Sequence, residues 1–128
     1  VFCLLLLILV TGCKKEKNSG NDISNIAGYW MGAYAYGNDP PDIKMSVIFR
    51  NNGTIKVYYG YNGNDTASAA FKPEGTYTLN NNVATFQYNE GSYVFIHKAT
   101  LTVANAQSGT WGTAPSDDDG GLYSLVLQ

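Results

Sequence analysis

The chain has 128 residues, of which 14% are charged and 13% are aromatic, and its formal net charge is −2 at pH 7. The charged share is well below the ~25% usual for soluble chains, while glycine (14 residues) and tyrosine (10 residues) are abundant. This balance is typical of β-rich folds. Few basic residues are present to neutralise phosphates, so we expect no nucleic-acid partner.

An apolar segment opens the sequence and runs from Val1 to Val10. It has about half of the ~20 residues that a helix needs to cross a bilayer, and its length matches the hydrophobic region of a secretory signal. The Lys- and Asn-rich stretch that follows is typical of a solvated tether. We therefore expect a signal peptide over residues 1–12 and a flexible tether over 13–25; the alternative is an N-terminal core strand or helix.

A short motif ends the apolar segment. Val10-Thr11-Gly12-Cys13 resembles the lipobox of bacterial lipoproteins. The resemblance implies that Cys13 is lipidated at its sulfur, becomes the first mature residue and anchors the protein to a membrane of the bacterial cell envelope, expected to be the outer membrane. Cys3 lies in the segment that would be removed, so the folded part would have no disulfide and no cysteine metal site.

Residues 26–128 are enough for one domain with its own core. The first strand is predicted over 28–36. Segment 43–50 alternates apolar and polar residues, and Asn51-Asn52-Gly53 suits a tight hairpin turn, so 54–61 should return antiparallel. The residues expected on the inner faces of this hairpin are Ile43, Met45, Val47, Phe49, Ile55, Val57, Tyr59 and Tyr61.

Further strands follow with short connections. They are predicted over 75–79, 83–88, 93–104, 108–113 and 122–127, with a weaker one over 69–72. Between eight and ten consecutive antiparallel strands leave edges that closure of the sheet removes. We therefore predict an all-β fold, a single antiparallel up-and-down barrel, with a β-sandwich as the alternative.

A Gly-x-Trp motif, Gly28-Tyr29-Trp30, begins the first predicted strand. It resembles the opening of lipocalin-like and avidin-like barrels. Together with segments 49–54, 109–112 and 120–125, it makes residues 26–128 similar to small lipocalin-like domains of bacterial lipoproteins. The resemblance implies that an indole closes one end of the barrel, and we expect Gly28, Trp30 and Trp111 to serve barrel closure.

Catalytic and metal signatures are missing from the sequence. His97 is the only histidine and no nucleophile-elbow motif accompanies it. Asp117-Asp118-Asp119 lacks the spacing of a calcium loop and is expected to be an exposed turn, and Glu90 falls in a predicted turn. We expect no enzyme activity, no metal and no cofactor. Alternation places His97 on the inner face, either as a buried histidine bonded to a tyrosine or as a polar contact for a ligand.

Tyrosines form the strongest candidate binding site. We expect Tyr34, Tyr36, Tyr59, Tyr61 and His97 to converge at the open barrel end or in its lumen. This cluster has no basic residue to pair an anion and no acid pair to hold a cation, which favours neutral polar ligands such as sugars. The prediction is a lipid-anchored module that binds a small molecule or glycan. The alternative is a structural or protein-interaction lipoprotein whose barrel is filled by its own side chains.

Overall fold

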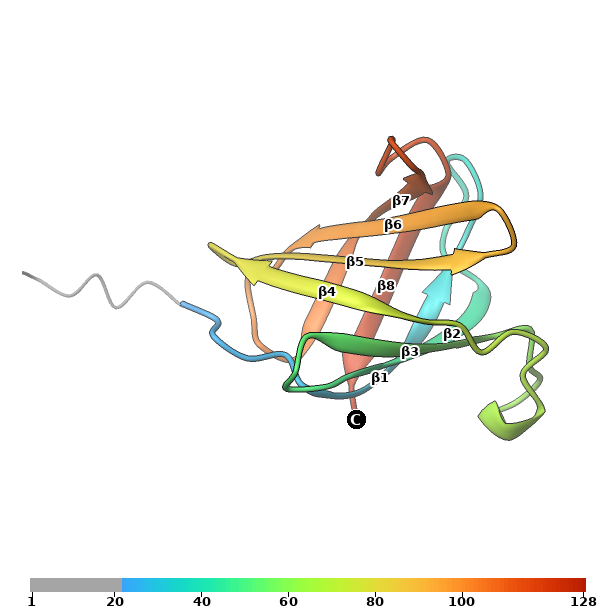
Figure 1. Ribbon diagram of the computed structural model, residues 1–128, viewed down its shortest axis with the longest axis horizontal. Coiled ribbons are helices and arrows are strands. Elements are labelled where there is room, and N and C mark those ends of the chain that lie inside the picture. The colour runs from blue at the N-terminus through green and yellow to red at the C-terminus, as the bar shows by residue number, and fades with distance from the viewer. Residues whose placement is uncertain (1–21) are drawn as a thin grey trace, which may run out of the picture.

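Eight antiparallel strands, each paired with its neighbours in sequence, form a closed barrel in the computed structural model, which describes residues 22–128 (Figure 1). The strands are β1 (Gly28–Tyr34), β2 (Ile43–Phe49), β3 (Thr54–Tyr59), β4 (Glu74–Asn80), β5 (Val83–Glu90), β6 (Tyr93–Thr100), β7 (Ala106–Thr113) and β8 (Gly121–Leu127). The predicted signal peptide, Cys13 and the tether up to residue 21 lie outside the described residues.

Pairing between β1 and β8 closes the sheet. Trp30 lies opposite Leu127, and Tyr34 lies opposite Tyr123. The two backbones approach so closely at Gly32 that an added Cβ would lie 1.8 Å from the Ser124 carbonyl oxygen. The predicted up-and-down barrel is therefore confirmed, with eight strands, and the sandwich alternative is excluded.

The hairpin of β2 and β3 forms as predicted. Val47 lies opposite Val57, and Gly53 has a φ of 82° in the turn, a conformation that favours glycine because it has no Cβ. Alternation places Val47 and Val57 in the barrel interior, where both are fully buried. Local sequence thus determines both the turn and the register of this hairpin.

Two predicted strands differ from the structure by more than two residues. The strand expected over 93–104 ends at Thr100, where the Leu101 amide donates to the Asn82 carbonyl oxygen at 2.7 Å and the chain turns into β7. Segment 69–72 contributes a single bridge, between Phe71 and Tyr59, and follows one 3-10 turn (Thr66–Ser68). Within residues 22–128 no helix has the length and apolar character needed to span a membrane.

The two ends of the barrel differ. The closed end carries the tight turns 50–53 and 81–82, the loop 101–105 and the incoming segment 22–27. In that segment Ile26 is buried, Ile23 packs against the core, and the Ile23 amide donates to Asn82 Oδ1 at 2.8 Å. Contacts with the barrel thus include Ile23, which lies before the predicted domain boundary at 26. The open end carries loops 35–42, 60–73, 91–92 and 114–120 (Figure 1).

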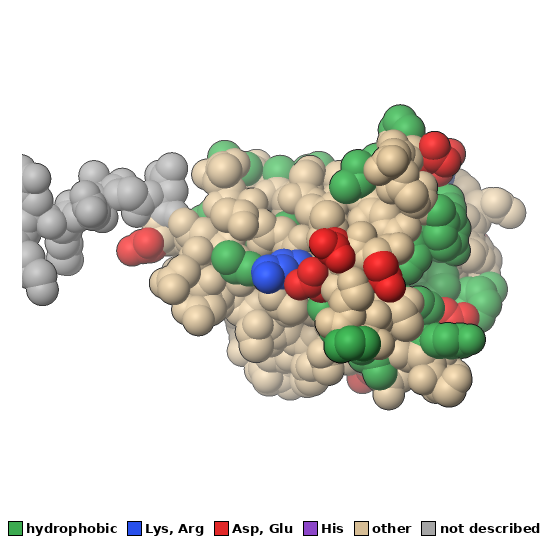
Figure 2. Space-filling model, turned by 90° about the horizontal axis from the view of Figure 1, so that it is seen from above, with side chains coloured by type: hydrophobic (Ala, Val, Ile, Leu, Met, Phe, Trp, Pro, Cys, Tyr) green, Lys and Arg blue, Asp and Glu red, His purple; other side chains and the backbone are tan. Residues whose placement is uncertain are grey.

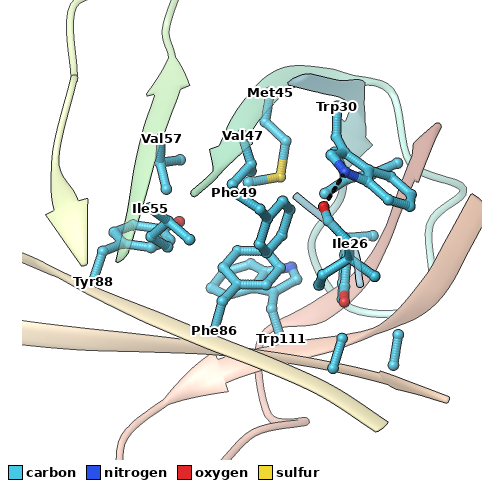
Figure 3. Close-up of a cluster of buried hydrophobic side chains, with 14 of the residues drawn as sticks. Ile26, Trp30, Met45, Val47, Phe49, Ile55, Val57, Phe86, Tyr88 and Trp111 are labelled. Carbon is cyan, nitrogen blue, oxygen red and sulfur yellow. Dashed lines mark hydrogen bonds between the residues drawn. The ribbon is translucent and has the colours of Figure 1, made fainter. Parts of the chain in front are cut away.

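Large side chains from several strands fill the lumen (Figure 3). An eight-stranded barrel has an interior just wide enough for side chains to fill or to hold one small ligand. Here side chains occupy the closed end and the middle of the barrel. The largest fully buried ones are Trp30, Tyr123, Phe49, Phe86, Ile26, Met45, Ile55 and Leu125.

Candidate functional site

A cavity of about 60 Å³ lies at the open end of the barrel, above the packed lumen. Its lining is almost entirely aromatic and comes from β1, the loop after it, β3, β5, β6 and β7. The lining residues are Tyr34, Tyr36, Tyr59, Tyr88, Glu90, Phe95, His97 and Trp111.

The β5–β6 ladder builds one wall of this cavity. Tyr88 lies opposite Phe95, and the next inward pair is Glu90 opposite Tyr93. Residues two apart in a strand point to the same face. Glu90 therefore continues the inward row of β5 to the rim of the barrel, where its side chain is half-buried.

Of the described residues that line the cavity, Glu90 is the one with a charged side chain. Its carboxylate accepts a hydrogen bond from the Tyr59 hydroxyl. Burial, reinforced by the neighbouring Tyr36 hydroxyl and the Glu90 charge, raises the pKa of Tyr34 to about 12. Burial and the hydrogen bond to Glu90 raise the pKa of Tyr59, and burial raises that of Tyr88. The raised pKa values keep the Tyr34, Tyr59 and Tyr88 phenols neutral at physiological pH.

His97 lies at the floor of the cavity, where it is 1% exposed. Its ring stacks on Phe86, with centroids 4.4 Å apart, and lies 6.1 Å from that of Trp111. Burial lowers its pKa to about 3, so the imidazole is neutral. Its Nδ1 has no hydrogen-bond partner among the described residues.

Aromatic side chains continue from the cavity onto the rim. Trp111 donates from its indole Nε1 to the Ala35 carbonyl oxygen at 2.9 Å, and its ring meets that of Tyr36 edge to face at 5.4 Å. Tyr36 is 60% exposed and Tyr93 is 62% exposed. These two tyrosines, Phe95 and Trp111 border a shallow groove of about 290 Å³ that adjoins the cavity.

Comparison with protein-family models matches residues 26–105 to a family described as a lipocalin-like domain. The chain belongs to this family. Comparisons with curated proteins and with solved structures found no match. A lipocalin-like barrel is consistent with the binding of a small ligand, and this barrel has its aromatic cavity at the open end.

Four of the five predicted ligand contacts meet in this lipocalin-like barrel. Tyr34, Tyr36, Tyr59 and His97 line the cavity. The prediction that Tyr61 shares the inner face of β3 is wrong. Gly60, with a φ of 72°, breaks the alternation, and the Tyr61 hydroxyl bonds Ser46 Oγ on the outer face of β2. Contact of the other four with a ligand stays a prediction.

The residues expected to close the barrel lie at opposite ends. Trp30 is fully buried near the closed end and donates from Nε1 to the Ile26 carbonyl oxygen at 2.9 Å (Figure 3). Gly28 has a φ of 140°, and an added Cβ would lie 2.7 Å from Leu127 Cδ1. Trp111 instead forms part of the wall at the open end.

Glu90 was missed because it follows Asn89 and precedes Gly91, a pattern typical of a turn. The structure places it as the last residue of β5. Extending the alternation of Ala84, Phe86 and Tyr88 by one step would have found it.

The predicted aspartate turn lies in the loop between β7 and β8. Asp119 Oδ1 accepts from the Thr113 amide at 2.8 Å, and Asp117 pairs with Lys98 at 3.5 Å. Across the part of the chain that the structure describes, no group of three or more histidine, cysteine or acidic side chains is placed to hold a metal ion.

Proposed function

We propose that this chain is a lipid-anchored, non-enzymatic module of the bacterial cell envelope that binds a small ligand at the open end of its barrel. The observation that carries this proposal is the aromatic cavity and its adjoining groove, which leave Tyr36 and Tyr93 more than half exposed. Binding pockets combine apolar and aromatic walls with a few polar groups. Here Glu90 and the tyrosine hydroxyls supply those groups.

The ligand is expected at the rim rather than deep in the lumen. Below the cavity, Phe86 and Tyr123 meet edge to face with centroids 5.6 Å apart, and both are fully buried. One water occupies about 30 Å³ in the liquid, so the cavity of about 60 Å³ holds about two water-sized groups. A ligand would therefore insert one small group and lay the rest along the groove.

A thermal-shift panel of neutral sugars, carboxylates and amines tests the binding function. A ligand of the rim should stabilise the wild type and lose that effect in Tyr36→Ala. Tyr61→Phe is the matched control, because Tyr61 lies on the outer face of the barrel and its substitution should leave ligand binding unchanged. If no compound shifts the wild type, or if both variants respond alike, the proposed site is wrong.

The anchor rests on the lipobox resemblance at Cys13. In a lipoprotein-competent host, mass spectrometry of the mature protein should find acylated Cys13 as its first residue. Cys13→Ser should remain uncleaved or unanchored. Export of the wild type with residues 1–12 still attached would contradict the predicted lipid anchor at Cys13.

The filled lumen favours a second candidate, a protein-interaction module of the envelope. Exposed aromatic rings such as Tyr36 and Tyr93 are enriched at protein interfaces. Cross-linking in intact cells, with a photoreactive residue in place of Tyr93, separates the two candidates. A discrete protein adduct combined with no small-molecule shift would favour the interaction module.

A further inference from the structure

We propose that the open-end cavity binds the protonated amino group of a small primary amine, with Glu90 as its counter-charge and aromatic rings as its walls. The inference rests on the proposed function, because it names the ligand class of the same site. It replaces the expectation of a neutral ligand, which depended on the absence of a basic residue and of an acid pair from the predicted tyrosine cluster; a single carboxylate, Glu90, lines the cavity.

Among the described residues, 22–128, no lysine, arginine or histidine forms an ion pair with the Glu90 carboxylate. The ion pairs found within residues 22–128 join Arg50 to Glu74, Lys56 to Glu74 and Lys98 to Asp117. Glu90 instead accepts from a neutral phenol, Tyr59, and no lysine or arginine of residues 22–128 lines the cavity. A half-buried carboxylate is stabilised by a nearby cation, and a ligand would have to supply it.

The walls of the cavity suit the same charge. The faces of aromatic rings carry a negative quadrupole that attracts ammonium groups. Tyr34 lies edge to face with both Tyr59 and Trp111, with centroids 6.5 Å and 5.8 Å apart. His97 at the floor is neutral because burial lowers its pKa to about 3, so it places no competing positive charge beneath the ligand.

The size of the cavity selects a primary amine. A volume of about 60 Å³ accepts about two water-sized groups, enough for an ammonium nitrogen and the carbon next to it. A trimethylammonium group has four heavy atoms and no N–H donor, so it needs more space than these two groups and cannot donate to the Glu90 carboxylate. A primary ammonium has three N–H donors, which the Glu90 carboxylate and nearby phenol oxygens can accept. The apolar remainder would lie along the adjoining groove, against Tyr93 and Phe95.

The surrounding loops give the open end a negative field. Its four loops carry six aspartates and one lysine, Lys72, while Lys44 and Lys98 reach these loops from the outer strand faces. Residues 22–128 hold nine acidic and five basic residues, a net charge of −4. On the face in Figure 2, acidic and hydrophobic side chains gather over the half away from the grey segment, and basic ones cover little of it. Such a field attracts cations and repels anions.

Isothermal titration calorimetry on the full chain tests the inference by comparing the Kd values of three compounds that share the same phenethyl group. Phenethylamine is the cation, 2-phenylethanol is the neutral analogue and 3-phenylpropanoate is the anion. We expect the amine to bind at least about tenfold more tightly than the other two, and more weakly at high salt, because ions screen exposed charges. The trimethylated amine should bind more weakly than phenethylamine.

Two variants test whether the negative charge that binds the amine is that of Glu90. Glu90→Gln keeps an acceptor for Tyr59 and removes the negative charge, so the Kd for the amine should rise by about tenfold while the Kd for 2-phenylethanol stays unchanged. Glu74→Gln is the control, because it removes the same charge from an exposed side chain that pairs with Arg50 and Lys56. It should leave both Kd values as in the wild type.

The outcomes separate this inference from the proposed function. Equal affinity of the wild type for the amine and the alcohol, or an unchanged amine Kd in Glu90→Gln, would overturn the assignment of an ammonium group and leave the binding site in place. Tighter binding of the trimethylated amine would overturn the choice of a primary amine. If none of the compounds in this series or in the thermal-shift panel binds the wild type, both proposals fail.

Discussion

Acidification should destabilise this barrel through His97, which is stacked against Phe86 and 1% exposed. Burial lowers its pKa from the usual 6.5 to about 3 in the folded protein. Between these two values the unfolded chain binds a proton that the folded chain does not, so the free energy of unfolding falls as the pH falls. The stability is fully present above pH 6.5 and is lost progressively toward pH 3. The expected loss between pH 7.5 and pH 4.5 is about 3 kcal/mol.

Urea denaturation at a series of pH values measures this loss, with His97→Phe as the reference. The variant cannot take up the proton, and protonation of carboxylates affects both proteins equally, so the difference between the two curves isolates His97. Because the sequence has one histidine, its imidazole Hε1 signal in the NMR spectrum needs no assignment. Parallel stability curves, or a folded-state titration midpoint near pH 6.5, would refute the argument.

Three further predictions concern packing and alkaline stability. Gly32→Ala should prevent or severely weaken barrel closure, because its Cβ would meet the Ser124 carbonyl oxygen at 1.8 Å. Urea denaturation should show a smaller loss for Gly63→Ala, about 1–2 kcal/mol, because its Cβ meets no described atom within 4 Å and the cost is the strain of an alanine at a φ of 61°. Phe86→Ala should cost about 3–5 kcal/mol in the same assay, since Phe86 is fully buried between Phe49 and Tyr123, and a loss below 1 kcal/mol would contradict a packed lumen. The pKa of Tyr34 is raised to about 12 in the folded protein, so its contribution to the free energy of unfolding is present below pH 10 and is lost as the pH rises toward 12. Tyr34→Phe should reduce this alkaline loss of stability. An identical alkaline stability profile in the variant and the wild type would contradict the prediction.

Much of the barrel could be predicted because its strands are defined locally. Alternation along 43–50 and 54–59, with an Asn-Gly turn between them, identifies the buried face before any tertiary contact is known. The same alternation places His97 on the inner face, where it lies opposite Phe86. A period of two residues holds as long as the backbone stays in a strand.

Prediction failed where the chain leaves the strands. Tyr61 follows Gly60, whose positive φ turns the chain outward, and alternation carries no information past such a residue. Ser46 was expected on the outer face and is fully buried because Tyr61 covers it. The turn at 101–105 contains no glycine or proline, so nothing in the local sequence marked the end of β6. The volume of the cavity depends on how side chains from six segments pack together, which no local pattern encodes.

Strand number explains why a site in this barrel would lie at the rim. An eight-stranded barrel has a narrow interior, and here Trp30, Phe86 and Tyr123 use that space for stability. Inward rows of residues nevertheless continue past the packed layer to the ends of the strands, and at the open end β5 and β6 terminate in Glu90 and Tyr93. A buried apolar residue at either position would stabilise the barrel more than these two side chains do. Glu90 is half-buried and charged, and Tyr93 is 62% exposed. Residues that break the pattern of the core without a structural gain are expected at functional sites, which is why the rim, and not the lumen, is the place to look for the ligand.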